Sequence, residues 1–146
     1  LELINKTNQF NLNGKRHTEA SWMDYLNDPR VFLLLGSYQD KFGPLGKIAV
    51  MSGRQDGSRF LVEHCVMSCR AFSRRIEHGC LLYLFRKFDV EEANFDFVAT
   101  PRNRPVQSFF LELTGAATPR NFSISAQRFV DNCPRVYLQI REDPDE

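Results

Sequence analysis

The first half of the chain begins with apolar residues at helical spacing and continues with segments that have the composition of β-strands. Over residues 19–26, apolar side chains recur three and four positions apart, which places Trp22, Tyr25 and Leu26 on one helical face. Thr18 can cap the start of this helix. Turn residues then separate three segments rich in β-forming residues, 30–39, 47–51 and 59–69. This half predicts one helix followed by three antiparallel strands.

Helical spacing returns over residues 73–88, and a short alternating segment at 94–99 predicts another strand. A third helix is expected to start within 100–103 and to end at Gly115. Its apolar face is Val106, Phe109, Phe110 and Leu113. Two closing strands are expected, at 122–129 and 135–140. This order predicts an α+β fold, with a central mixed, mostly antiparallel sheet flanked by helices.

The length of 146 residues fits one domain. We expect a joining segment at 1–17, a domain at 18–141 and an acidic tail at 142–146. The formal net charge of +1 argues against nucleic-acid binding, which requires a strongly basic face. The apolar runs are far shorter than the ~20 residues of a membrane helix, and the N-terminus lacks the pattern of a signal peptide.

The four cysteines are too sparse for a disulfide framework, which favours free thiols in a reducing cytoplasm. Three of them fall near two histidines, which raises the possibility of zinc. The group is His64, Cys65, Cys69, His78 and Cys80. No two of them have the C-x-x-C or H-x₃-H spacing of a structural zinc site. No metal is therefore expected in this domain.

Four segments carry a more specific signal, and they occur in order from Leu3 to Phe110. They are residues 3–12 (LINKTNQFNL), 40–46 (DKFGPLG), 67–70 (MSCR), and the Thr100-Pro101-Arg102-Asn103 turn with the helix after it. Each resembles a segment of the C-terminal domain of FkbH-like proteins, which belong to the HAD superfamily. That domain has the fold of the GNAT acyltransferases, so the resemblance implies the same fold here.

FkbH-like enzymes load a three-carbon glyceryl unit onto the phosphopantetheine arm of an acyl carrier protein. The resemblance therefore implies two partners, the carrier protein and an upstream HAD-type domain. The loading chemistry is placed in that HAD-type domain. This chain is then expected to bind CoA or a phosphopantetheine thioester in a V-shaped cleft, if it is active at all.

In GNAT enzymes a loop of the form Arg/Gln-x-x-Gly-x-Gly/Ala precedes the long helix and cradles the cofactor pyrophosphate. The corresponding loop here is 70–75 (RAFSRR), in which Ser73 and Arg75 replace the two small residues. A side chain at a position of close approach obstructs a phosphate, so the loop looks damaged. The resemblance implies these cofactor-binding residues: Met67, Cys69, Arg70, Ser73, Arg74, Arg75 and Asn103.

The catalytic residues are less well defined. Many GNAT enzymes have a tyrosine general acid where Phe110 stands here, and a phenyl ring has no proton to donate. Glu63 or His64 could act as a general base, and Cys69 beside Arg70 could act as a nucleophile. Tyr83 is expected in the core, and nothing in the sequence places Tyr38 or Tyr137 near the cleft.

A second interpretation makes the domain a docking module without catalytic activity, with a decayed CoA site. Five arginines would then face the acidic surface of the carrier protein: Arg70, Arg74, Arg75, Arg102 and Arg104. The residues leave both interpretations open.

Overall fold

The computed structural model describes residues 1–7, 9–69, 75–116, 120–134 and 140. The helices in this part of the chain are α1 (Glu2–Lys6), α2 (Glu19–Leu26), α3 (Ile76–Phe88), α4 (Arg104–Thr114) and α5 (Ala126–Asn132). The strands are β1 (Phe10–Asn11), β2 (Val31–Asp40), β3 (Gly43–Asp56), β4 (Arg59–Met67), β5 (Glu92–Phe95) and β6 (Phe122–Ser125). None of the helices described is long and apolar enough to cross a membrane.

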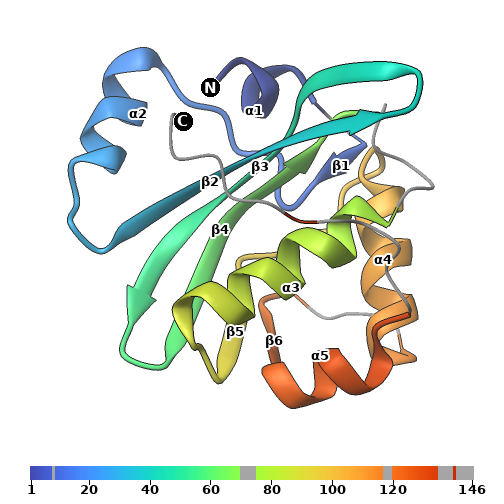
Figure 1. Cartoon of the computed structure of the whole chain (residues 1–146). Coiled ribbons are helices and arrows are strands. Elements are labelled where there is room, and N and C mark those ends of the chain that lie inside the picture. The colour runs from blue at the N-terminus through green and yellow to red at the C-terminus, as the bar shows by residue number, and fades with distance from the viewer. Residues whose placement is uncertain (8, 70–74, 117–119, 135–139, 141–146) are drawn as a thin grey trace.

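The six strands form one sheet in the order β2-β3-β4-β5-β6, and β1 pairs with β4 outside this path. All pairs are antiparallel except β4 with β5. In Figure 1, α3 crosses one face of the sheet, and α4 and α5 lie on the same side. The predicted α+β class, with a mixed, mostly antiparallel sheet flanked by helices, is confirmed.

Two apolar clusters hold these layers together. The larger one lies between the sheet and α3, α4 and α5, and it includes Phe60, Leu84 and Phe110, each at most 1% exposed. The smaller one joins α1 and α2 to the opposite face of the sheet through Ile4, Trp22, Val50 and Val66. The long β3–β4 hairpin is therefore covered by helices on both of its faces.

Several predicted elements agree closely with the structure. The helix at 19–26 is α2, and its Thr18 side chain accepts a hydrogen bond from the Ser21 backbone N–H at 3.1 Å. The predicted helix that ends at Gly115 is α4, and Gly115 has a positive φ of 75°. Both helices have local start or stop signals, so the sequence alone predicts them well.

Other predictions were wrong at their boundaries. Residues 43–46 and 52–56 were predicted as turns but belong to β3, which pairs with β2 from Gly43 to Arg54. The predicted strand at 122–129 stops at Ser125, whose side chain accepts a hydrogen bond from the Arg128 N–H and starts α5. The predicted strand at 135–140 lies almost entirely outside the described residues.

The N-terminal residues are part of the packed structure. The joining segment at 1–17 contains the helix α1 and the short strand β1. Ile4 and Leu12 are fully buried, and Phe10 is 3% exposed. The segment thus contributes to both apolar clusters, while its role as a junction to an upstream domain remains a prediction.

A bulge in the β3–β4 pair changes the direction of β4. Ser52 pairs with His64 and Gly53 pairs with Val62, so Glu63 is the extra residue. A Cβ atom on Gly53 would lie 1.8 Å from the Leu61 carbonyl oxygen, so only glycine allows this approach of the two backbones. Bulges bend a strand and increase its twist. The sheet opens immediately beyond this bulge.

We predict that Gly53→Ala destabilises the protein by more than about 3 kcal/mol, because the clash is with backbone and cannot be relieved by a side-chain rotation. The measurement is the free energy of unfolding from a urea titration. Gly36→Ala is the matched control, since its Cβ would come no closer than 3.0 Å to any atom, with the Ala49 Cβ nearest and the Cys80 Sγ next at 3.8 Å. Equal losses in the two variants would show that the close approach at Gly53 is unimportant.

Candidate functional site

The candidate site is the fork that opens between β4 and β5. The two strands pair in parallel from Arg59 with Glu92 to Val62 with Phe95. One more backbone bond follows, from the Asp96 N–H to the Val62 carbonyl at 2.9 Å. Beyond this point β4 continues toward Met67 without β5 beside it. The thioester cleft that the resemblance implies would lie here, beside Met67.

Residues 10–13 occupy this fork. Phe10 pairs with Met67 and Asn11 pairs with Val66, and the Leu12 N–H donates to the Cys65 carbonyl at 3.1 Å. Figure 1 shows β1 beside the far end of β4. The edge of β4 that faces the fork is therefore already engaged by the chain itself.

Hydrogen bonds also tie the segment to the other side of the fork. The Val98 N–H donates to the Leu12 carbonyl at 3.1 Å. The Asn103 side chain donates to the Asn11 carbonyl at 3.0 Å and to the Val98 carbonyl at 2.8 Å. Residues 10–12 thus act as an inserted strand between β4 and the segment that follows β5.

Asn13 lies at the point where the fork begins. Its side-chain Nδ2 donates to the Glu63 carbonyl at 2.8 Å and to the Asp96 carbonyl at 2.9 Å. These carbonyls belong to the two diverging backbones, and Glu63 is the bulged residue. One amide group therefore donates a hydrogen bond to each strand at the point where the two strands stop pairing with each other.

Two further asparagines fix the shape of the N-terminal segment. The Asn11 side chain, 2% exposed, accepts from the Gly14 N–H at 2.9 Å and donates to the Thr7 carbonyl at 3.0 Å. The Asn5 side chain donates to the His17 carbonyl at 2.8 Å and accepts from the His17 N–H at 3.0 Å. The inserted strand is thus held by side-chain amides at several points.

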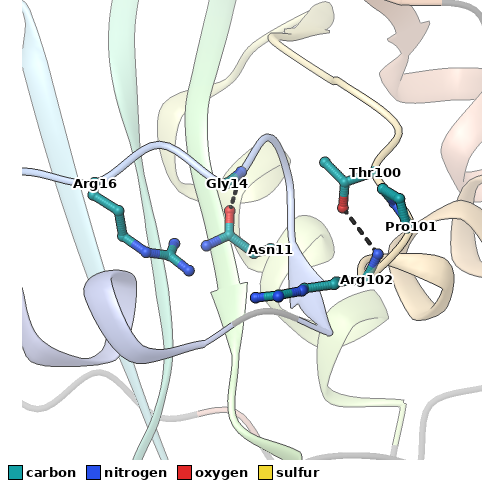
Figure 2. A pocket seen from close by; sticks show the side chains of 6 residues that line it. All are labelled: Asn11, Gly14, Arg16, Thr100, Pro101 and Arg102. Carbon is teal, nitrogen blue, oxygen red and sulfur yellow. Dashed lines mark hydrogen bonds between the residues drawn. The ribbon is translucent and has the colours of Figure 1, made fainter.

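A pocket of about 350 Å³ lies at the mouth of the filled fork. Its lining comes from the segment after β1 and from the turn before α4, namely Asn11, Gly14, Arg16, Thr100, Pro101 and Arg102. In Figure 2 the side chains of Arg16 and Arg102 extend toward each other from the two sides, beneath Asn11. The pocket lining therefore includes two cationic side chains.

The two candidate general bases, Glu63 and His64, do not face an open cleft. Glu63 accepts hydrogen bonds on both carboxylate oxygens from the Arg54 guanidinium, at 2.8 and 2.9 Å. His64 is 3% exposed and packs against Trp22 and Tyr25 on the α2 side of the sheet. Neighbouring residues of a regular strand point to opposite faces, but here the bulge brings both side chains close to Tyr25.

His64 forms a pair with His17, with their Nε2 atoms 2.9 Å apart. Such a contact requires one ring to donate and the other to accept, so the two rings cannot both be protonated. Burial is the main factor that lowers the pKa of His64 to about 4, and the charges of His17 and Lys15 lower it further. Burial also lowers the pKa of His17. The pair is uncharged at neutral pH.

Of the predicted cofactor-binding residues, the structure brings two together. Met67 is 1% exposed at the end of β4, and Asn103 is 1% exposed beside Asn11; both contact the inserted strand. Cys69 is an exposed free thiol, and Arg75 precedes α3 with a left-handed φ of 57°. Arg70, Ser73 and Arg74 lie outside the described residues.

The other candidate groups are not placed for chemistry. Phe110 lies in an aromatic cluster with Phe95, Phe97 and Phe122, at centroid distances of 4.4–5.3 Å. Tyr38 is on the edge strand β2, and Tyr137 lies outside the described residues. Burial raises the pKa of the Cys65 and Cys80 thiols, the latter to about 12. Within the described ranges, no three His, Cys, Asp or Glu side chains converge as metal ligands.

The filled fork and its pocket are built by four residues that were not predicted as site residues: Asn11, Asn13, Arg16 and Thr100. The available signal was the density of asparagines, at positions 5, 8, 11 and 13. Asparagine is also common in ordinary turns, so this density alone does not reveal contacts made fifty and more residues away.

No protein-family model matches the chain, and no curated protein matches it. Among solved structures, spermidine N-acetyltransferase from Vibrio cholerae in complex with CoA and spermine is 10% identical, with a TM-score of 0.49. The similarity covers 77% of this chain and 75% of that one. A point mutant of that enzyme is 9% identical at a TM-score of 0.48, covering 75% and 74%. Similarities at this level do not establish a function.

We predict that Asn13→Ala loosens the inserted strand, since two backbone carbonyls at the fork lose their donor. The free energy of unfolding should fall by about 2–3 kcal/mol. Amide hydrogen exchange should become faster at Leu12 and Val98. Asn132→Ala, at the exposed end of α5, is the control and should change neither quantity. Unchanged exchange at Leu12 and Val98 would contradict the role of Asn13.

We also predict a loss of stability in mild acid from the histidine pair. A histidine whose pKa falls from 6.5 to about 4 on folding stabilises the folded state above pH 6.5. This contribution, on the order of 2–3 kcal/mol, is lost as the pH falls from 6.5 toward 4. The free energy of unfolding, measured at pH 7.0, 6.0 and 5.0, shows the size of this loss. His64→Gln should flatten this dependence, and an equally steep decline in that variant would refute the assignment.

Proposed function

We propose that this chain is the GNAT-like domain of an FkbH-like enzyme, and that it docks the acyl carrier protein rather than transferring an acyl group from CoA. One observation carries the proposal: residues 10–13 fill the fork between β4 and β5. The sequence resemblance from Leu3 to Phe110 and the observed order of helices and strands support the family assignment.

Filling of the fork removes the groups that a thioester would need. Direct transfer requires strand backbone N–H groups to hold the thioester carbonyl. Between Cys65 and Met67, the edge of β4 that faces the fork pairs with residues 10–12. A thioester arm can bind there only if it displaces a strand whose Phe10 and Leu12 side chains are almost fully buried.

The acid–base groups also argue for docking. Among the described residues near the fork, Glu63 is paired with Arg54, and His64 is buried against His17. Phe110 occupies the place of the expected general acid and is enclosed by other phenyl rings. None of these three groups is positioned to move a proton to or from a bound acceptor.

Exposed arginines at the start of α4 favour an acidic partner. Arg102 and Arg104 lie on the surface beside the mouth of the fork, and Arg75 precedes α3. A carrier protein presents an acidic surface in this interpretation, so complementary charge would guide its approach. Arg70 and Arg74, which belong to the same proposal, lie outside the described residues.

We predict that holo carrier protein binds this domain and that acetyl-CoA does not. Isothermal titration at 50 and 200 mM salt tests both ligands. The carrier affinity should fall steeply with added salt, as expected for contacts between exposed charges. Arg102→Gln and Arg104→Gln should each weaken carrier binding about three- to tenfold.

The opposite outcome is equally clear. Tight binding of acetyl-CoA to the wild-type domain would mean that the inserted strand yields to the cofactor, and an acyltransferase would replace the docking module as the best interpretation. If neither ligand binds, both interpretations fail. A circular dichroism spectrum of each variant controls for folding.

A further inference from the structure

The strand β2 forms an open edge of the sheet. Among the described strands only β3 lies beside it, and the two pair from Val31 to Asp40. An edge strand exposes a row of backbone N–H and C=O groups, which can pair with a strand of another molecule. Such an edge is a potential interface unless other groups cover it or the strand itself prevents pairing.

A hydrogen bond of Arg30 shows which backbone groups of β2 face outward. The Gln55 N–H donates to the Arg30 carbonyl at 3.0 Å, so the backbone of Arg30 faces β3. Because this direction alternates along a strand, Leu33 and Leu35 direct their N–H and C=O groups away from β3. In the part of the chain that the structure describes, neither of these two residues has a hydrogen bond on the outer side.

The side chains of Leu33 and Leu35 lie on the face of the sheet that carries α2. Leu33 is opposite Ser52, and Leu35 is opposite Val50, which belongs to the same apolar cluster as Trp22 of α2. However, Leu33 is 38% exposed and Leu35 is 44% exposed. The open backbone edge is therefore bordered by two exposed apolar side chains.

The strand β2 lacks the features that usually keep an edge strand from pairing. Those features are charged side chains, prolines and bulges in the edge strand itself. Residues 31–39 read VFLLLGSYQ and contain neither a charge nor a proline. The two irregularities of the β2–β3 pair insert Leu45 and Ile48, which belong to β3. The edge strand is therefore regular and uncharged over nearly its whole length.

We propose that two copies of this chain pair through β2 as antiparallel strands, so that their sheets join into one. Such a pair has a two-fold axis and closes on itself as a dimer. The charges at the two ends of β2 favour this orientation, because Arg30 and Asp40 have opposite signs. Parallel pairing would place each end beside its own copy and like charges together, whereas antiparallel pairing brings opposite charges together.

One register satisfies both the charges and the outward backbone groups. When Leu35 lies opposite its own copy, Arg30 lies opposite the Asp40 of the other copy. In this register Leu35 and its copy exchange N–H···O=C bonds, and Leu33 exchanges them with Ser37 of the other copy. The two Leu35 side chains then lie on the same face and cover each other.

Backbone pairing and apolar contact supply most of the attraction in such a dimer. Arg30 already forms an ion pair with Asp28 at 2.9 Å, and its side chain is 65% exposed, so its charge sets the orientation rather than the affinity. The fork between β4 and β5 is separated from β2 by β3. Pairing at β2 therefore does not depend on carrier docking, and either can fail without the other.

We predict a weak dimer of the whole chain, because the paired strands are short and bury an area at the lower end for specific interfaces. Sedimentation velocity from about 5 to 500 µM protein should give a Kd on the order of 100 µM. Leu35→Lys should weaken the dimer at least about tenfold, since two like charges would lie opposite each other.

Leu61→Lys is the matched control. Leu61 is 41% exposed and lies on the same face of the sheet, because its neighbours Phe60 and Val62 belong to the apolar cluster on the other face. It belongs to β4, which is not an edge strand. This substitution should leave the Kd of the dimer within about twofold.

Amide hydrogen exchange measures the backbone pairing directly. Exchange at Leu33 and Leu35 should become slower as the protein concentration rises, because their outward N–H groups then bond to the other copy. Phe32 and Leu34 already face β3, so their exchange should not change with concentration. In the Leu35→Lys variant the exchange at Leu33 should no longer depend on concentration.

Three results would overturn the proposal. The first is a chain that stays monomeric at the highest concentration, and the second is equal weakening of the dimer by Leu35→Lys and Leu61→Lys. The third is exchange at Leu33 and Leu35 that is independent of concentration, which would place the contact elsewhere even if a dimer forms. Unfolding temperatures show whether a variant folds, and Leu33→Lys replaces Leu35→Lys, with the same expected weakening, if the latter does not.

Discussion

The satisfaction of backbone hydrogen bonds at the β4–β5 fork is the constraint on which the rest of this structure depends. A buried strand edge without partners is costly, so the open side of β4 beyond Val62 must be paired by some group. Here residues 10–12 supply the missing strand, and the Asn13 amide bridges the two backbones where they part. The bulge that opens the fork and the segment that closes it are therefore two parts of one arrangement.

The same constraint makes ligand and strand mutually exclusive. A backbone N–H in β4 can serve either the inserted segment or a thioester arm, and the inserted segment has the advantage of covalent attachment. Its advantage is increased by buried Phe10 and Leu12, which lie in the same apolar cluster as Met67 and Phe97. A domain arranged in this way keeps the fork between two parallel strands while the chain itself occupies that fork.

The elements that the sequence predicted well are those specified by neighbouring residues. α2 and α4 have their caps and apolar faces within a dozen residues, and the hairpin tip at Asp56-Gly57 is equally local. The pairing of Phe10 with Met67 joins residues far apart in the chain, and no local pattern specifies it. Gly53 was hidden for a related reason, because Ser52–Ser58 has the composition of a turn, and only the approach of Leu61 shows what the glycine permits.

The filled fork determines where Arg16 and Arg102 lie. The inner edge of β4 is paired, and at the rim of the fork the returning chain carries Arg16 past the turn that carries Arg102. These arginines sit on the two segments that the inserted strand connects. A thioester inside the fork would require the fork to open. Access to it therefore depends on one short segment, residues 10–13, and the asparagines in that segment determine how firmly it is held.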